Sequence, residues 1–211
     1  MTDPHDISRP PRVILLTGPS GAGKSRLSAR SGLPVMRLDD FYKEAGDPTL
    51  PMLPHGIGVD WDSAGSWDAE AAVSAVHELC VKGRTTVPLY DISQSARVGT
   101  ETLTLDGARL FIAEGIFAAD IVPRCRELGL LADAICLRGR PTTTFRRRLV
   151  RDLREGRKSA LFLLRRGLRL LRAEGAIVAR HRELGAHPCA RDEAAERIRR
   201  LRTADDTRTA R

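Results

Sequence analysis

Several features that define whole classes of proteins are scarce in this chain of 211 residues. Its four cysteines lie far apart, without a Cys-x-x-Cys pair or nearby paired histidines, which argues against a zinc site and a disulfide framework. Reduced thiols in a cytoplasmic protein are the simplest interpretation. No stretch approaches the roughly 18 to 20 apolar residues that a membrane span needs, so we expect no membrane partner.

The two ends of the sequence are polar. Residues 1–11 have no apolar segment of the secretory type, so we expect a flexible N-terminus and no secretion. Residues 203–211 are expected to form a disordered tail. Between them, residues 12–202 are predicted to form one domain, because 42% hydrophobic residues are enough for a core.

Positive charge is unevenly distributed along the chain. The net charge is +8, and fifteen Lys and Arg face three Asp and Glu between Arg138 and Arg182. Such a block must meet phosphates, an acidic partner or solvent, and charge alone does not choose among them. Residues 159–172 predict a basic amphipathic helix, which we expect to pack its leucines on the domain rather than to bind a membrane or nucleic acid.

Apolar runs of strand length alternate with segments of helical period. The predicted strands are 12–17, 35–38, 109–113 and 132–137, with a possible hairpin formed by 85–90 and 98–105. A helix is predicted to begin at Ser66 and to end at Gly83. This alternation predicts an α/β fold with a mostly parallel sheet, in which ligands bind at the carboxyl ends of the strands.

A phosphate-binding motif follows the first predicted strand. Residues 18–25 match G-x-x-x-x-G-K-[ST] in full, between a buried strand and a helix, which is the context that the motif requires. Glycines let backbone N–H groups converge on phosphate oxygens, Lys24 reaches the β- and γ-phosphates, and the Ser25 hydroxyl can ligate Mg²⁺. The predicted ATP-binding residues are Gly18, Pro19, Ser20, Gly21, Ala22, Gly23, Lys24, Ser25 and Arg26. The motif predicts a P-loop NTPase with a three-layer α/β/α fold.

Two acidic positions stand at the ends of predicted strands. Asp39 follows the second strand, where a carboxylate can accept a proton from an attacking hydroxyl, an effect worth about 10²- to 10⁴-fold in rate. Glu114 ends a later apolar strand, the position of a carboxylate that holds Mg²⁺ directly or through water. Taken singly, an Asp-Asp pair is more often a solvated acidic turn, and Glu114 could equally be an ordinary strand-end glutamate.

Five segments occur in the same order as in the uridine kinase and phosphoribulokinase family of P-loop kinases. They are Gly18 to Ser25, Leu38-Asp-Asp-Phe-Tyr42, Pro88-Leu-Tyr-Asp91, Ala113-Glu-Gly-Ile116 and Arg147-Arg-Leu-Val-Arg-Asp152. The chain resembles this family from about residue 12 to residue 158, roughly two thirds of its length.

The resemblance implies roles for individual side chains. Asp39 would deprotonate a sugar 5′-hydroxyl, Asp60 would accept from the 2′- and 3′-hydroxyls, and Tyr90 would lie beside the nucleobase. The implied catalytic residues are Asp39, Lys24, Arg147, Arg148 and Arg151, the arginines belonging to a small basic helical lid at about 140–160. The implied substrate-binding residues are Asp60, Tyr90, Arg97 and Tyr42, and the implied metal ligands are Ser25 and Glu114.

The predicted function is therefore that of an ATP- and Mg²⁺-dependent kinase for the 5′-hydroxyl of a pyrimidine nucleoside. Uridine kinases usually carry a base-reading histidine where this chain has Ser95, so a pantothenate or sugar-phosphate kinase is the alternative. From another class, the chain could be a nucleic-acid-coupled ATPase, but it lacks an arginine-flanked aromatic platform, so we expect no nucleic-acid partner. Relatives in the family often assemble, which leaves a homo-oligomer open.

Overall fold

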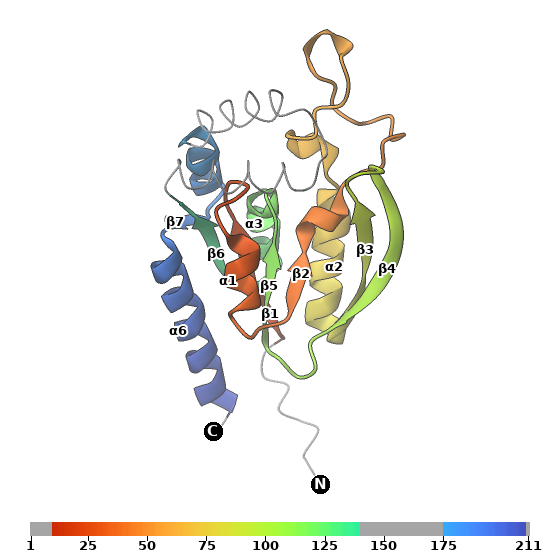
Figure 1. The fold of residues 1–211 in the computed structure, drawn as a ribbon. Helices are drawn as coiled ribbons and strands as arrows, with labels where there is room; N and C mark the ends of the chain where they lie inside the picture. Colours follow the sequence, from red (N-terminus) through yellow and green to blue (C-terminus); the bar gives the residue numbers. More distant parts are fainter. Residues whose placement is uncertain (1–9, 140–174, 210–211) are drawn as a thin grey trace.

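The computed structural model describes residues 10–139 and 175–209. Within this part of the chain, five strands form one parallel sheet in the order β2-β5-β1-β6-β7 (Figure 1). Their bounds are β1 Arg12–Thr17, β2 Val35–Arg37, β5 Leu110–Glu114, β6 Leu131–Leu137 and β7 His187–Cys189. The predicted parallel sheet is confirmed, with β1 at its centre.

Helices cover both faces of this sheet. Alternate residues of β1 point to opposite faces, so Val13 and Leu15 pack on one side while Ile14 and Leu16 pack on the other. The first side is covered by α2 (Ala69–Lys82) and α3 (Val122–Glu127), and the second by α1 (Lys24–Ala29) and α6 (Arg191–Thr209). A strand buried on both faces needs a continuous apolar run, which is what residues 12–17 provide. The arrangement is the predicted three-layer α/β/α fold.

A hairpin stands apart from the main sheet. Strands β3 (Arg84–Asp91) and β4 (Ala96–Thr104) pair antiparallel with each other in a separate two-stranded sheet, which confirms the predicted hairpin. The short helix η1 (Leu38–Phe41) follows β2, and the long connection 43–68 runs from it to α2. That connection contains η2 (Pro54–Gly56) and η3 (Ala64–Ser66) and projects beyond the main sheet (Figure 1).

The start of α2 differs from the prediction. Asp68, not Ser66, is its N-cap, because the Asp68 carboxylate accepts a hydrogen bond from the backbone N of Ala71 at 2.9 Å. The Ser66 hydroxyl instead donates to the carbonyl oxygen of Ser63 at 2.7 Å within the preceding turn. The helix does end at Gly83, whose φ of 68° gives the left-handed cap that glycine favours.

The C-terminal part of α6 is a second difference. The helix continues to Thr209, so the prediction of a disordered tail is wrong for residues 203–209. Polarity alone suggested disorder, but a helix whose first turns are fixed by packing can be extended by polar residues that lie in solvent. Within the extension, the Thr207 hydroxyl donates to the carbonyl oxygen of Thr203 at 2.7 Å.

Part of the predicted organisation lies outside the described residues. This applies to the lid at about 140–160 with Arg147, Arg148 and Arg151, and to the basic helix predicted over 159–172. Within residues 10–139 and 175–209, no helix is long and apolar enough to cross a membrane. The remaining helical elements are η4 (Ala118–Ile121), which precedes α3, and residues 175–183, which precede β7.

Candidate active site

The P-loop joins β1 to α1 at the carboxyl edge of the main sheet. Gly18, Gly21 and Gly23 have φ angles of 133°, 85° and 98°, in the region that favours glycine. A Cβ at Gly18 would also overlap the carbonyl oxygen of Leu137 at the end of β6. The loop therefore lies against the neighbouring strand, and its shape depends on backbone atoms rather than on side chains.

Lys24 is folded back over the loop. It is buried, and its Nζ donates to the carbonyl oxygens of Gly18 and Pro19 at 2.9 and 3.4 Å. A buried ammonium group must be paired or hydrogen-bonded, and here the loop backbone supplies the acceptors. The charge is thus held at the concave side of the motif. Arg26, two residues further along α1, has an exposed side chain at the same edge.

Glu114 brings a buried carboxylate to the P-loop from the end of β5. Its side chain is 6% exposed, and Oε2 has no hydrogen-bond partner among the described residues. Burial raises the pKa of Glu114, and the negative charge of Asp39 adds to this effect. A hydrogen bond from the Ser25 hydroxyl and the positive charge of Lys24 act in the opposite direction.

A magnesium ion fits this arrangement. An unpartnered carboxylate oxygen next to a serine hydroxyl offers the hard oxygen ligands that Mg²⁺ prefers, and Mg²⁺ commonly takes the rest of its shell from phosphates and water. In the described ranges, no group of three or more His, Cys, Asp or Glu side chains could hold a metal without such help. Ser25 and Glu114 are therefore suited to an ion that arrives with a nucleotide.

Asp39 lies in η1, beside the end of β5. Its Oδ1 accepts a hydrogen bond from the backbone N of Ile116 at 3.0 Å. A Cβ at Gly115 would lie 2.9 Å from that oxygen and 2.8 Å from the Cβ of Leu38, so the close approach of Asp39 to β5 depends on glycine.

The neighbouring Asp40 has different surroundings, since it is buried and forms an ion pair with Arg37 at 3.4 Å. Burial raises the pKa of Asp40, which the charge of Arg37 partly offsets.

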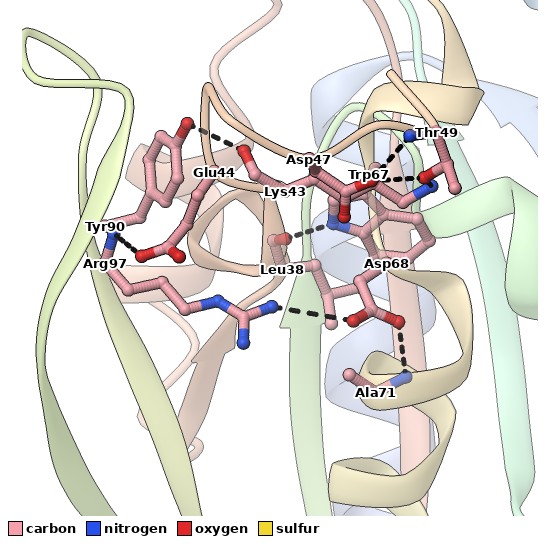
Figure 2. A network of polar contacts seen from close by, with 10 residues as sticks. All are labelled: Leu38, Lys43, Glu44, Asp47, Thr49, Trp67, Asp68, Ala71, Tyr90 and Arg97. Atoms are coloured by element: carbon pink, nitrogen blue, oxygen red, sulfur yellow. Dashed lines mark hydrogen bonds and ion pairs between the residues drawn. The ribbon is translucent and has the colours of Figure 1, made fainter. Parts of the chain in front are cut away.

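Aromatic rings gather between η1 and the β3–β4 hairpin. The ring centroid of Tyr42 lies 6.0 Å from that of Trp61, 5.8 Å from that of Tyr90 and 5.9 Å from that of Phe117. The Tyr90 hydroxyl donates to the carbonyl oxygen of Lys43 at 3.1 Å (Figure 2). The structure thus brings together Tyr42 and Tyr90, two of the predicted substrate-binding residues.

Arg97 connects the hairpin to the rest of this region. Its backbone N donates to the Glu44 carboxylate at 3.2 Å, and its guanidinium pairs with Asp68 at 3.5 Å (Figure 2). Asp68 also caps α2, so one carboxylate serves both the helix and the hairpin. The Arg97 guanidinium is therefore already paired with a carboxylate, that of Asp68.

Asp60 forms its hydrogen bonds locally, next to Trp61, whose carbonyl oxygen accepts from the Tyr42 hydroxyl at 3.2 Å. It lies in the 43–68 connection, where Oδ1 accepts from the backbone N of Asp62 at 3.2 Å and its own backbone N donates to Pro51 at 2.7 Å. In the described part of the chain, its hydrogen bonds stay within residues 51–63. Its predicted contact with a ribose remains a prediction.

Two basic residues near the P-loop were not found from the sequence. The Nδ1 atom of buried His181 lies 3.3 Å from the Oγ1 of Thr17, and burial lowers the pKa of His181 to about 4. Arg191, the first residue of α6, lies so close to Gly23 that a Cβ there would overlap its Nη2. Both come from the last part of the chain, and neither belongs to a motif that could have identified it.

Comparison with known proteins supports the resemblance. No family model matches the chain. It is 26% identical over 167 residues to the uridine kinase of Chlamydia pneumoniae, covering 76% of this chain and 72% of that protein. It is 29% identical over 111 residues to the inorganic pyrophosphatase TTM1 of Arabidopsis thaliana, but it spans only 16% of that relative's length.

A solved structure shares the fold. A proposed fructose transport system kinase from Silicibacter sp. TM1040 superimposes with a TM-score of 0.58 at 22% identity, over 84% of this chain and 88% of that one. The parallel sheet, its helical layers and the P-loop define a P-loop protein of the three-layer α/β/α class. The similarity to the uridine kinase of Chlamydia pneumoniae agrees with the resemblance stated from the sequence motifs.

Proposed function

We propose that the protein is an ATP- and Mg²⁺-dependent kinase that transfers the γ-phosphate to a hydroxyl group of a small molecule. The observation that supports this most directly is the convergence of Lys24, Glu114 and Asp39 from the ends of β1, β5 and β2. An ATPase that only positions a water molecule does not need a carboxylate such as Asp39 to accept a proton from an alcohol. The similarity to the uridine kinase of Chlamydia pneumoniae supports the same reaction class.

On the donor side, the P-loop backbone and Lys24 would bind the β- and γ-phosphates. Ser25 and Glu114 would hold Mg²⁺, which neutralises phosphate charge when it is bound. Glu114 is suited to this task because its carboxylate is buried and one oxygen lacks a partner among the described residues. Its position next to Ser25 is set by the parallel pairing of β5 with β1, in which Leu16 lies opposite Glu114.

On the acceptor side, Asp39 would act as the general base. Its Oδ1 is occupied by the Ile116 backbone N, which orients Oδ2 for the proton of an incoming hydroxyl. That proton moves to Asp39 as the hydroxyl oxygen bonds to the γ-phosphorus. The bond between this phosphorus and the β,γ-bridging oxygen breaks, and ADP leaves with that oxygen.

For the acceptor itself we propose a pyrimidine nucleoside. The rings of Tyr42 and Tyr90 provide apolar surface on which a base can stack. One observation favours the alternative, a pantothenate or sugar-phosphate kinase: Ser95 stands where uridine kinases usually have a histidine. Its hydroxyl hydrogen-bonds the Tyr90 phenol, and its carbonyl oxygen accepts from Ala45 at 2.9 Å.

The test is ADP release from Mg²⁺-ATP across uridine, cytidine, pantothenate and sugar phosphates. Asp39→Asn should lower turnover about 10²- to 10⁴-fold, since it removes the base. Asp106→Asn, in the turn after β4, is the matched control and should retain full activity. Turnover with only a different alcohol would leave the reaction class intact and overturn the nucleoside. Stimulation by RNA or DNA alone would overturn the kinase proposal.

A further inference from the structure

Helix α6 brings a guanidinium group to the phosphate-binding loop. Besides the close approach of its Nη2, the Cζ of Arg191 lies 3.5 Å from the position that a Cβ on Gly23 would occupy. Gly23 immediately precedes Lys24, in the part of the motif where successive backbone N–H groups form a concave anion site. The guanidinium therefore lies beside the loop that would bind phosphates, rather than on a distant surface.

The position of Arg191 is fixed from several directions. Arg197, further along α6, forms two hydrogen bonds with the Asp133 carboxylate of β6, at 2.9 and 3.0 Å. Arg202 donates to the carbonyl oxygen of Ser31 after α1 at 2.9 Å. Ala194 and Ile198 are buried between α6 and the sheet. The first turn of α6 is thus held against the P-loop.

The charge of Arg191 has no acidic partner within residues 10–139 and 175–209. Two carboxylates of this region have other partners: Glu193 contacts His187 at 3.2 Å, and Asp133 pairs with Arg197. The half-buried guanidinium approaches Gly23, the residue before Lys24, so an anion bound at the loop would be attracted by both cations. The arrangement calls for a polyanionic ligand.

We propose that Arg191 is a donor-binding residue that hydrogen-bonds the phosphate chain of the nucleotide. The inference rests on the proposed function, because it takes the ligand of the P-loop to be a nucleoside triphosphate. A guanidinium can present two parallel N–H donors to a phosphate, and such charge-assisted bonds are the strong ones. Arg191 approaches from the β6–β7 side of the loop, whereas Asp39 lies at the end of β2 on the other side. It therefore serves the donor and not the acceptor.

The experiment measures equilibrium binding of Mg²⁺-ATP without any acceptor, so it is independent of turnover. Arg191→Gln should weaken the affinity for ATP and ADP by about 10- to 100-fold, as expected for losing a hydrogen bond to a charged group. Arg191→Lys should recover part of that loss. The matched control is Arg200→Gln on the same helix, whose exposed side chain pairs with Glu196 and which should bind like the wild type.

A competition with Mg²⁺-tripolyphosphate identifies the part of the nucleotide that is contacted. If Arg191 binds phosphate, the affinity for tripolyphosphate falls by the same factor as that for ATP. An unchanged tripolyphosphate affinity, or an unchanged ATP affinity in Arg191→Gln, would overturn the inference while leaving the proposed kinase standing. A wild-type protein that binds no Mg²⁺-ATP would instead overturn the proposed function, and this inference with it.

Discussion

The proposed donor side and the proposed acceptor side of the site are built differently. The donor side, formed by the P-loop and Glu114, lies at the ends of the central strands of the parallel sheet, and its Lys24 and Glu114 side chains are buried. The acceptor side, formed by the 43–68 connection and the β3–β4 hairpin, is held by ring contacts and by a half-exposed ion pair, Arg97 with Asp68. The P-loop is shaped by its backbone, whereas side chains take part in the contacts that join the hairpin to the 43–68 connection (Figure 2).

This difference has a physical basis. Every nucleoside triphosphate presents the same phosphate chain, so a fixed backbone cradle can bind it and the required glycines recur as a motif. Acceptors differ in shape, so their recognition depends on side chains placed by loops, which tolerate change better than a core does. Four substitutions test whether the two sides are as independent as they look.

The largest effect is expected at Glu114. Glu114→Gln should lower kcat about 10²- to 10³-fold, as for other preorganised groups that stabilise charge in the transition state. The same change should stabilise the unliganded protein at neutral pH, because it removes a buried charge whose Oε2 lacks a partner among the described residues. A gain of about 1 kcal/mol would raise Tm by about 2–4 °C in a chain of this size.

The pH dependence of stability shows whether the Glu114 charge stabilises or destabilises the folded protein. Because the pKa of Glu114 is raised in the folded state, that state binds more protons than the unfolded chain. The unliganded wild type should therefore gain stability from this group as pH falls through the raised pKa, and Glu114→Gln should lack that gain. A variant that is less stable at neutral pH and equally active would contradict the assignment.

The second largest effect concerns His181, which lies beneath the P-loop. Burial, together with the charges of Arg180 and Lys24, lowers its pKa to about 4, while Asp120 acts in the opposite direction. Its unfolded pKa is near 6.5, so this group contributes stability above pH 6.5 that is lost as pH falls toward 4, by at most about 3 kcal/mol.

Denaturation of His181→Gln between pH 7 and 4 measures this contribution. The variant should have a flatter stability profile than the wild type over that window. The exposed His77 on α2 provides the control, since His77→Gln should leave the profile unchanged. Parallel profiles for the wild type and His181→Gln would contradict the burial argument.

The third effect tests the junction of the two sides at Gly115. An added Cβ meets Leu38 and Asp39, so Gly115→Ala should cost about 1–3 kcal/mol of unfolding free energy. Displacement of Asp39, the proposed general base, should also lower kcat by up to about 10²-fold. Gly46→Ala, in the acceptor-side connection, has open space around the new Cβ and should change neither quantity measurably.

The smallest effect is expected at Arg97. Arg97→Gln should raise the acceptor KM by about 10-fold through loss of hairpin placement, while the KM for ATP stays constant. Stability should change by less than about 1 kcal/mol, because the ion pair with Asp68 is partly exposed. Lys82→Gln, which removes a similar exposed pair with Glu78, should alter neither KM. An increase in the KM for ATP would show that the two sides are coupled.

The sequence predicted where the P-loop and Glu114 lie in the fold. The apolar runs 12–17 and 109–113 become β1 and β5 because only strands covered on both faces can be apolar throughout. The P-loop motif then fixes Lys24 and Ser25, and parallel pairing places Glu114 beside them. These residues are predictable because a short motif and a strand end determine their positions.

Other features depend on contacts between distant parts of the chain. The three-residue strand β7 contains Pro188 and has no alternation, so only its pairing with β6 reveals it. The N-cap at Asp68 was missed because Ser66 is an equally good capping residue in sequence. Arg191 is one of 35 basic residues, and nothing local distinguishes it. On the acceptor side, the ring contacts of Tyr42 depend on how a long connection folds.

The separation of the β3–β4 hairpin from the main sheet also bears on how such a protein can diversify. Since β3 and β4 pair only with each other within the described residues, an insertion or a changed turn between them does not shift the register of any strand that holds the P-loop. Evolution, or a protein engineer, could replace the β3–β4 hairpin with a different one and select for activity on new acceptors. The P-loop and the residues proposed to act with it would be inherited unchanged.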